Sequence, residues 1–151
     1  MRPPECGGAA TACDTRIGFA VSGDRVLLDS VILIDHFNGV EAATAYLREV
    51  ADTAHVSAIT RAEVLTGFDD EDLPLACSLL DTFPLLVIDR EVADLAAALR
   101  RANRWRLPDA LQVAVARRHG LLLATRNTKD FPPDDHDFVV VPYVVRRQRR
   151  R

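Results

Sequence analysis

The chain has little cysteine and no long hydrophobic segment. Its three cysteines, Cys6, Cys13 and Cys77, form no Cys-x-x-Cys pair, which argues against a disulfide framework or a zinc site and favours a reducing, intracellular setting. No apolar run approaches the ~20 residues that a membrane-spanning helix needs. The first 24 residues also lack the long apolar centre of a secretory signal. We therefore expect a cytoplasmic protein without a membrane partner.

The size and composition of the chain predict one globular domain. Its 151 residues are 48% hydrophobic and 27% charged, which is enough apolar material for a real core and excludes wholesale disorder. No internal repeat and no interdomain linker is visible. The expected organisation is a loose leader over residues 1–24, a folded domain over 25–145 and a basic tail over 146–151.

Charge is distributed unevenly along the chain. Residues 1–99 carry 6 basic and 17 acidic side chains, whereas residues 100–151 carry 13 basic and 5 acidic ones. One interpretation is ordinary solvated charge, increased by the arginine-rich tail. The other is a basic face for a polyanion beside an acidic site for a cation. The pattern alone leaves both open.

Short apolar runs alternate with stretches of helical periodicity. We expect strands at 25–29, 55–59, 85–88, 121–124 and 138–141. We expect helices at 31–37 with Ser30 as the cap, at 41–51, from Thr60 onward, at 71–83, at 92–102 and from Pro108 to Gly120. This alternation predicts an α/β layer fold with a mainly parallel sheet.

Four carboxylates fall near the ends of the predicted strands. Asp29 ends the first strand, and Glu63 lies in the first helical turn after the second. Asp109 lies in the first turn of the helix that leads into strand 121–124, and Asp130 follows that strand. Because right-handed connections open the loops of a parallel sheet on one edge, we expect these four acids to share a small volume.

Each of these acids also has a purely structural explanation. Glu63 could complete a capping box that begins at Thr60. Asp130 stands in the same relation to Asn127. Asp109 in a first helical turn is favoured by the helix dipole. Helix capping could therefore account for every acid taken singly, but it does not explain why all of them fall on one edge.

A cluster of carboxylates is costly without a cation. Two unit charges ~4 Å apart repel by about 4 kcal/mol at an effective dielectric near 20. A divalent cation would remove that penalty, and oxygen ligands suit Mg²⁺, or Mn²⁺ as a substitute, better than zinc. Such an ion activates water and stabilises charge on a phosphodiester oxygen.

Four segments carry a resemblance to a known family. They are VLLDSVILID (26–35), SAITRAEVLTG (57–67), PDALQVAVA (108–116) and ATRNTKDF (124–131). In order and spacing they resemble the motifs of PIN-domain ribonucleases, and the match extends over about residues 26–145. Within that family the likeness is to VapC, the toxin of bacterial VapBC toxin–antitoxin pairs. The resemblance implies a PIN-like three-layer domain whose central, mainly parallel sheet is flanked by helices.

The resemblance also implies an activity and its partners. It implies a Mg²⁺-dependent endoribonuclease that acts on structured RNA such as tRNA and so inhibits translation and growth. It further implies a homodimer that is neutralised by a small VapB-type antitoxin. The rival hypothesis, from a different class, is a non-catalytic PIN-like module that binds RNA or protein. A phosphatase of the haloacid dehalogenase type is excluded, because Asp29-Ser30-Val31 lacks the required Asp-x-Asp.

Roles for individual residues follow from the same resemblance. Asp29 and Asp109 are the implied metal ligands, and Glu63 and Asp130 are the implied remaining acids of the catalytic site. The residues implied to orient these acids, or in the last case to meet an RNA phosphate, are Ser30, Thr125, Asn127 and Arg126. Many family members carry an acid where this chain has Asn127, so the fourth acidic role depends on Asp130 alone.

Several further residues have two interpretations. Asp35 is expected to be a surface acid on the first helix, with contact to the site as the alternative. Trp105 is expected to pack in the core or a dimer contact, with stacking on an RNA base as the alternative. Helix 71–83 and the leucines of 95–99 are expected to pack in the core, with a groove for an antitoxin helix as the alternative. The four histidines show no ligand spacing and receive no catalytic role.

Overall fold

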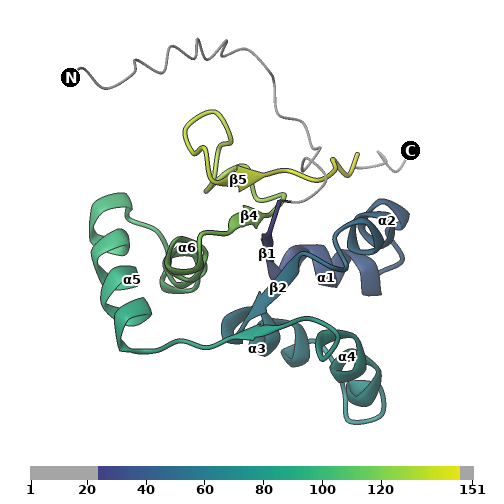
Figure 1. Cartoon of the computed structure of the whole chain (residues 1–151). Coiled ribbons are helices and arrows are strands. Elements are labelled where there is room, and N and C mark those ends of the chain that lie inside the picture. The colour runs from purple at the N-terminus through teal and green to yellow at the C-terminus, as the bar shows by residue number, and fades with distance from the viewer. Residues whose placement is uncertain (1–23, 147–151) are drawn as a thin grey trace, which may run out of the picture.

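The computed structural model describes residues 24–146, so the expected leader and basic tail lie outside the described residues except for Asp24 and Arg146. Strands and helices alternate along the chain (Figure 1). The strands are β1 (Val26–Leu28), β2 (Ala54–Ser57), β3 (Leu85–Leu86), β4 (Leu122–Ala124) and β5 (Val139–Val140). The helices are α1 (Ser30–Phe37), α2 (Glu41–Glu49), α3 (Ala58–Thr66), α4 (Leu73–Leu80), α5 (Arg90–Asn103) and α6 (Leu107–His119).

The five strands form one sheet in which every neighbouring pair is parallel. The strand order is β3-β2-β1-β4-β5, and central Leu27 is in register with His55 of β2 and Leu123 of β4. The chain builds outward from β1 to one side and then returns to build on the other. Strand order therefore reverses between β1 and β4, which is the point where open α/β sheets place their ligand sites.

Helices cover both faces of this sheet, as the alternation of side chains along β1 shows. Val26 and Leu28 are fully buried against the core cluster formed with α1 to α4. Leu27, between them, is fully buried in the opposite cluster, which is formed mainly with α5 and α6. Figure 1 shows the same two helical groups on opposite sides of the strands. The predicted three-layer α/β fold with a parallel sheet is confirmed.

The capping residues of two helices differ from the sequence prediction. Asp29, not Ser30, caps α1, and its side chain accepts a hydrogen bond from the Ser30 amide. Ser57, not Thr60, caps α3, and its hydroxyl accepts from the Thr60 amide. Helix α3 therefore starts two residues earlier than expected. The predicted end of α6 is confirmed, since Gly120 adopts the left-handed conformation (φ 64°) that favours glycine.

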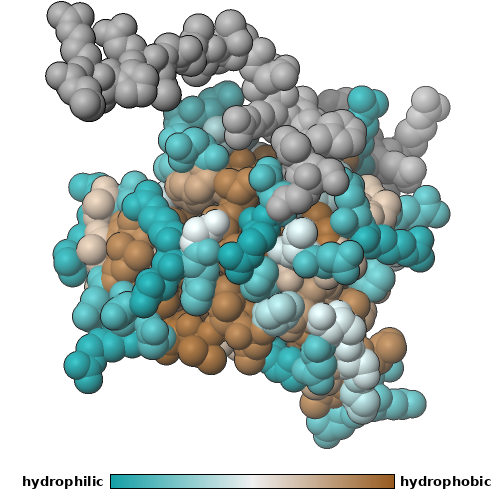
Figure 2. Space-filling model, in the orientation of Figure 1, coloured by the Kyte–Doolittle hydropathy of each residue, from teal (hydrophilic) through white to brown (hydrophobic). Residues whose placement is uncertain are grey.

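The surface of the described domain combines charged and apolar areas. Figure 2 shows hydrophobic side chains reaching the surface on one face, bordered by hydrophilic residues. Large hydrophobic residues that are exposed include Leu75, Leu85, Val87, Leu107 and Val144. No helix within residues 24–146 has the length and apolar character needed to cross a membrane.

Candidate active site

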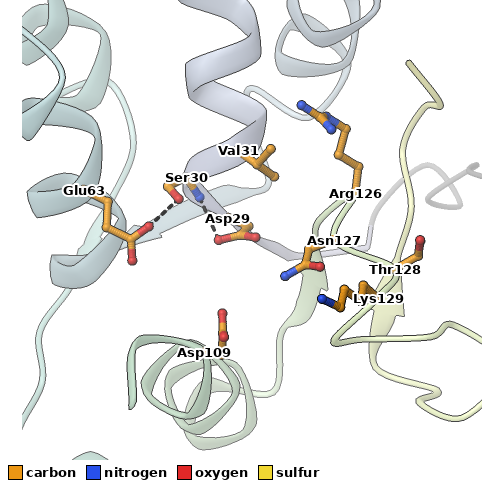
Figure 3. A pocket seen from close by; sticks show the side chains of 9 residues that line it. All are labelled: Asp29, Ser30, Val31, Glu63, Asp109, Arg126, Asn127, Thr128 and Lys129. Atoms are coloured by element: carbon orange, nitrogen blue, oxygen red, sulfur yellow. Dashed lines mark hydrogen bonds between the residues drawn. The ribbon is translucent and has the colours of Figure 1, made fainter. Parts of the chain in front are cut away.

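A cavity of about 450 Å³ opens where β1 and β4 end. Figure 3 shows its lining: three carboxylates from three different elements face a common space, and basic and amide side chains close the other side. The lining residues are Asp29, Ser30, Val31, Glu63, Asp109, Arg126, Asn127, Thr128 and Lys129. Three of the four predicted acids thus come together, from segments up to 80 residues apart in the sequence.

Asp29 is held on one wall of the cavity by three donors. Its Oδ1 accepts from the Ser30 amide at 2.9 Å and from Gln112 Nε2 at 3.4 Å. Its Oδ2 accepts from the Thr125 hydroxyl at 2.7 Å. These donors come from α1, α6 and the end of β4, so the fold itself fixes the orientation of the carboxylate. The predicted contact of Thr125 with an acid of the site is present.

Gln112 connects the site to the interior, a role that the sequence had not indicated. Its buried amide donates to Thr60 Oγ1 at 2.6 Å and accepts from the Ser57 hydroxyl at 2.6 Å. Thr60 in turn donates to the Leu28 carbonyl at 2.9 Å. Such a satisfied buried network is rigid. The available signal was that Gln112 is the single polar residue in the otherwise apolar helical run 110–116.

Glu63 does not serve as a helix cap. It is exposed on α3, and its Oε2 accepts from the Ser30 hydroxyl at 2.6 Å. Since Ser57 supplies the cap of this helix, the capping-box explanation of Glu63 is wrong. Ser30 therefore joins two acids of the cavity, because its amide contacts Asp29 and its hydroxyl contacts Glu63.

Asp109 faces these two acids from the first turn of α6 (Figure 3). Burial is the largest cause that raises its pKa, to about 6, and the negative charges of Asp130, Asp29 and Glu63 raise it further. The positive charge of Arg106 acts in the opposite direction. Asp109 therefore interacts electrostatically with each of the other three predicted acids, although these come from distant segments.

Asp130 lies outside the cavity lining, in an exposed turn after β4. Its Oδ2 accepts from Asn127 Nδ2 at 2.9 Å, and its amide donates to Asn127 Oδ1 at 3.4 Å. The Asn127 amide also donates to Thr125 Oγ1 at 3.0 Å. Asn127 thus orients Asp130 from a turn that is itself anchored to the Thr125–Asp29 contact.

Arg126 pairs with Asp35, an acid that was expected on the surface of the first helix. Asp35 is only 5% exposed, so the surface expectation is wrong. It accepts hydrogen bonds from Nε and Nη2 of Arg126 and, at 2.8 Å, from the Tyr143 hydroxyl. The bonds from Arg126 lower the pKa of Asp35, and Tyr143 adds to this, while burial opposes it. No local sequence pattern links residues 35, 126 and 143.

Two other side chains near the site differ in character. Trp105 packs edge-on against Phe131 with ring centroids 5.3 Å apart, which agrees with the expected core packing. Lys129, to which the sequence analysis gave no role, lines the cavity and points toward the carboxylates in Figure 3. No sequence pattern indicates this role, because Lys129 comes close to the three acids only when the turn after β4 has folded.

The donor set suits a hydrated, oxygen-preferring cation. Within residues 24–146, no three His, Cys, Asp or Glu side chains are gathered closely enough to enclose a metal ion by themselves. Mg²⁺ does not need such an enclosure, because it keeps several waters and is usually held by one or two carboxylates. Burial and, after it, the charges of neighbouring acids raise the pKa of Asp109, and a bound cation would offset both. Asp29 and Asp109, on opposite walls, fit this description.

Comparisons with known proteins agree with the fold. Among solved structures, a toxin–antitoxin complex from Klebsiella pneumoniae is 36% identical, with a TM-score of 0.74, and the match covers 80% of this chain and 99% of that chain. FitAcB from Neisseria gonorrhoeae is 26% identical (TM-score 0.64; 78% and 96% covered). VapBC2 from Rickettsia felis, bound to a promoter DNA fragment, is similar in fold at 17% identity (TM-score 0.63; 76% and 95% covered).

Family assignment follows from sequence as well as structure. No curated protein matches the chain significantly. The model of the PIN domain, however, matches residues 26–132, which include β1 to β4 and all four predicted acids. The chain therefore belongs to the PIN domain family.

Proposed function

We propose that this protein is the toxin of a type II toxin–antitoxin module and a Mg²⁺-dependent endoribonuclease. The observation that carries the proposal is the convergence of Asp29, Glu63 and Asp109 on one cavity at the switch point of the sheet. The similarity to the Klebsiella toxin–antitoxin complex supports the biological setting. Structured RNA such as tRNA is the proposed substrate class, and the proposed consequence is inhibition of translation and growth in the cytoplasm.

Asp29 and Asp109 are the proposed direct ligands of the ion. A divalent cation bound at this place would activate water and stabilise charge on a phosphodiester oxygen. The chain's own contribution is orientation: Thr125 and the Ser30 amide hold Asp29, and the Ser30 hydroxyl holds Glu63. Outer contacts of this kind preserve ligand geometry and affinity.

Glu63 and Asp130 are the proposed acids that position the attacking water. Glu63 is exposed to the cavity and can accept a proton from water there. Asp130 lies further out, held by Asn127, and adds to the negative charge around Asp109. Arg126, at the rim, is the proposed contact for an RNA phosphate.

The proposed partners are a VapB-type antitoxin, the RNA substrate and a second copy of the chain. Light scattering on the purified protein tests the dimer directly. Coexpression with the antitoxin gene tests neutralisation, since growth arrest by the toxin alone should then be relieved.

Cleavage of tRNA with Mg²⁺ or with EDTA tests the activity. We expect cleavage only with Mg²⁺, and we expect Asp29→Asn and Asp109→Asn each to lower the rate at least ~100-fold, as loss of one transition-state contact does. Asp94→Asn, which changes an exposed acid on α5 away from the cavity, is the matched control. Undiminished cleavage by Asp109→Asn would refute the assignment. Binding of tRNA without any cleavage would favour the non-catalytic PIN-like module.

A further inference from the structure

Asp35 is the only acidic residue of the described chain that is buried. Neither helix capping nor the proposed metal site accounts for it, because it lies in the middle of α1, outside the cavity lining. We propose that Asp35 is a positioning residue that orients Arg126 toward a phosphate of the RNA at the cavity rim. This inference rests on the proposed nuclease function and adds a determinant of how that site holds its substrate.

The bonds of Asp35 tie together three distant parts of the chain. Arg126 follows β4 and Tyr143 follows β5, 91 and 108 residues away from Asp35. A buried carboxylate is costly unless it is paired and hydrogen-bonded, and here the fork of Arg126 and the hydroxyl of Tyr143 meet that requirement. The arrangement is therefore specific, because removing either partner leaves a buried charge or acceptor unsatisfied.

Arg126 is fixed on one side and free on the other. A guanidinium has five N–H donors, and within residues 24–146 its hydrogen bonds use Nε and Nη2, which leaves Nη1 for a ligand. The side chain is 35% exposed and lines the cavity. In Figure 3 its guanidinium lies beside α1 and points away from the space between the three carboxylates. A phosphate bound there would lie at the rim rather than between the proposed metal ligands.

Pre-orientation by Asp35 gives Arg126 an advantage over an unrestrained cation. A guanidinium already held as a planar fork loses less side-chain entropy for each further hydrogen bond. Lys129, the other cation of the lining, takes part in no ion pair among the described residues. If Asp35 and Arg126 served only as a brace between α1 and β4, Lys129 would be the natural phosphate contact instead.

Charge alone and positioning predict opposite effects of Asp35→Asn on the affinity for RNA. Asp35→Asn removes a negative charge close to the site, so simple charge arithmetic predicts tighter RNA binding. Positioning predicts weaker binding, because Arg126 loses the partner that orients it. The measurement is tRNA binding by the full chain in an Asp109→Asn background, titrated with salt, so that cleavage does not interfere.

We expect Arg126→Gln to reduce the slope of log affinity against log salt by about 0.7–0.9, the value for one phosphate contact. Asp35→Asn should reproduce most of that reduction, and Tyr143→Phe should act in the same direction by less. Tyr143→Phe removes only a hydroxyl, so it decides the question if Asp35→Asn does not fold. Glu91→Gln is the matched control, since it removes the acid from the exposed Arg118–Glu91 pair and should leave the slope unchanged.

Two results would overturn the inference. One is unchanged or tighter binding by folded Asp35→Asn together with unchanged binding by Tyr143→Phe. The other is a loss of slope in Lys129→Gln but not in Arg126→Gln, which would make Asp35 a brace only. Neither result touches the proposed nuclease function, which fails instead if the unmodified protein does not cleave RNA with Mg²⁺.

Discussion

The two walls of the cavity hold the same functional group in opposite ways. On the β1 wall, Asp29 accepts hydrogen bonds from the Ser30 amide, the Thr125 hydroxyl and Gln112. On the α6 wall, the carboxylate of Asp109 accepts no hydrogen bond from residues 24–146, and burial and neighbouring acids raise its pKa to about 6. The fold therefore supplies hydrogen-bond donors to Asp29 but none from residues 24–146 to Asp109, whose charge a bound cation would stabilise.

The largest expected effect is that substitutions on the two walls change the free energy of unfolding in opposite directions. Asp29→Ala removes a helix cap and the acceptor of two side-chain donors, which should lower the free energy of unfolding by about 2–3 kcal/mol. Asp109→Asn relieves repulsion and should raise it by roughly 1 kcal/mol at pH 7, a figure reduced for solvent screening because the group is only partly buried. Urea unfolding in EDTA measures both. Destabilisation by both substitutions would contradict the comparison.

Substitutions of Thr125 test how much the stability of the wall around Asp29 depends on a single hydroxyl. Thr125 is fully buried, and its Oγ1 donates to Asp29 while accepting from the Asn127 amide. Thr125→Val keeps the shape but leaves both groups unsatisfied, so we expect a loss of about 1–3 kcal/mol in unfolding free energy. Thr125→Ser retains the hydroxyl and should lose clearly less. Equal losses would assign the effect to packing instead of the hydrogen bonds.

The dependence of stability on pH separates Asp109 from Asp35. An acid whose folded pKa is raised favours folding below its unfolded pKa of 3.8, and this contribution is lost as the pH rises through about 6. Asp35, whose pKa is lowered, contributes above 3.8 and loses that contribution as the pH falls through its folded value. In EDTA, Asp109→Asn should therefore flatten the stability profile between pH 4 and 6. A profile unchanged by the substitution would contradict this.

Magnesium should reverse the penalty at Asp109. Protons and the cation compete for this carboxylate, so stabilisation by added Mg²⁺ should be strong at pH 7.5 and largely lost at pH 5. Thermal unfolding at several Mg²⁺ concentrations measures it. Asp109→Asn should show little stabilisation at either pH, and a response like that of the unmodified protein would place the ion elsewhere.

The smallest expected effect is at the contact between the Asp29 wall and Glu63. Ser30→Ala removes the hydroxyl that donates to Glu63 at 2.6 Å but keeps the amide that donates to Asp29. Because Glu63 is exposed, we expect only about 0.5–1 kcal/mol less stability. The rate of RNA cleavage should fall by more than this small loss of stability explains, since the orientation of Glu63 is lost. A drop in stability alone would remove Glu63 from the proposed catalytic group.

The sequence predicts features that local patterns encode and misses those made by distant partners. Alternating strands and helices were visible because apolar periodicity is local, and Pro108 and Gly120 mark the bounds of α6 by their own backbone preferences. The convergence of Asp29, Glu63 and Asp109 followed from the rule that parallel strands end on one edge. The cap of α3 was misplaced because Ser57 and Thr60 are both residue types that cap helices, and only the folded chain shows which of them does so.

The supporting contacts were not predictable in the same way. Gln112 meets Asp29 across 83 residues of chain and Asp35 meets Arg126 across 91. Nothing in the neighbouring residues specifies those partners, since they depend on which strands lie side by side. Asp35 in particular looks like any exposed helical acid until β4 and β5 bring Arg126 and Tyr143 to it.

The central place of β1 has a consequence for the order of events during synthesis. β1 leaves the ribosome early, yet one of its two neighbours, β4, begins about a hundred residues later, at Leu122. Until that segment emerges, Asp29 lacks the Thr125 hydroxyl and Asp109 has no finished wall to face. The cavity is therefore complete only after most of the chain has been translated, because its two walls and the end of β4 come from segments up to about a hundred residues apart.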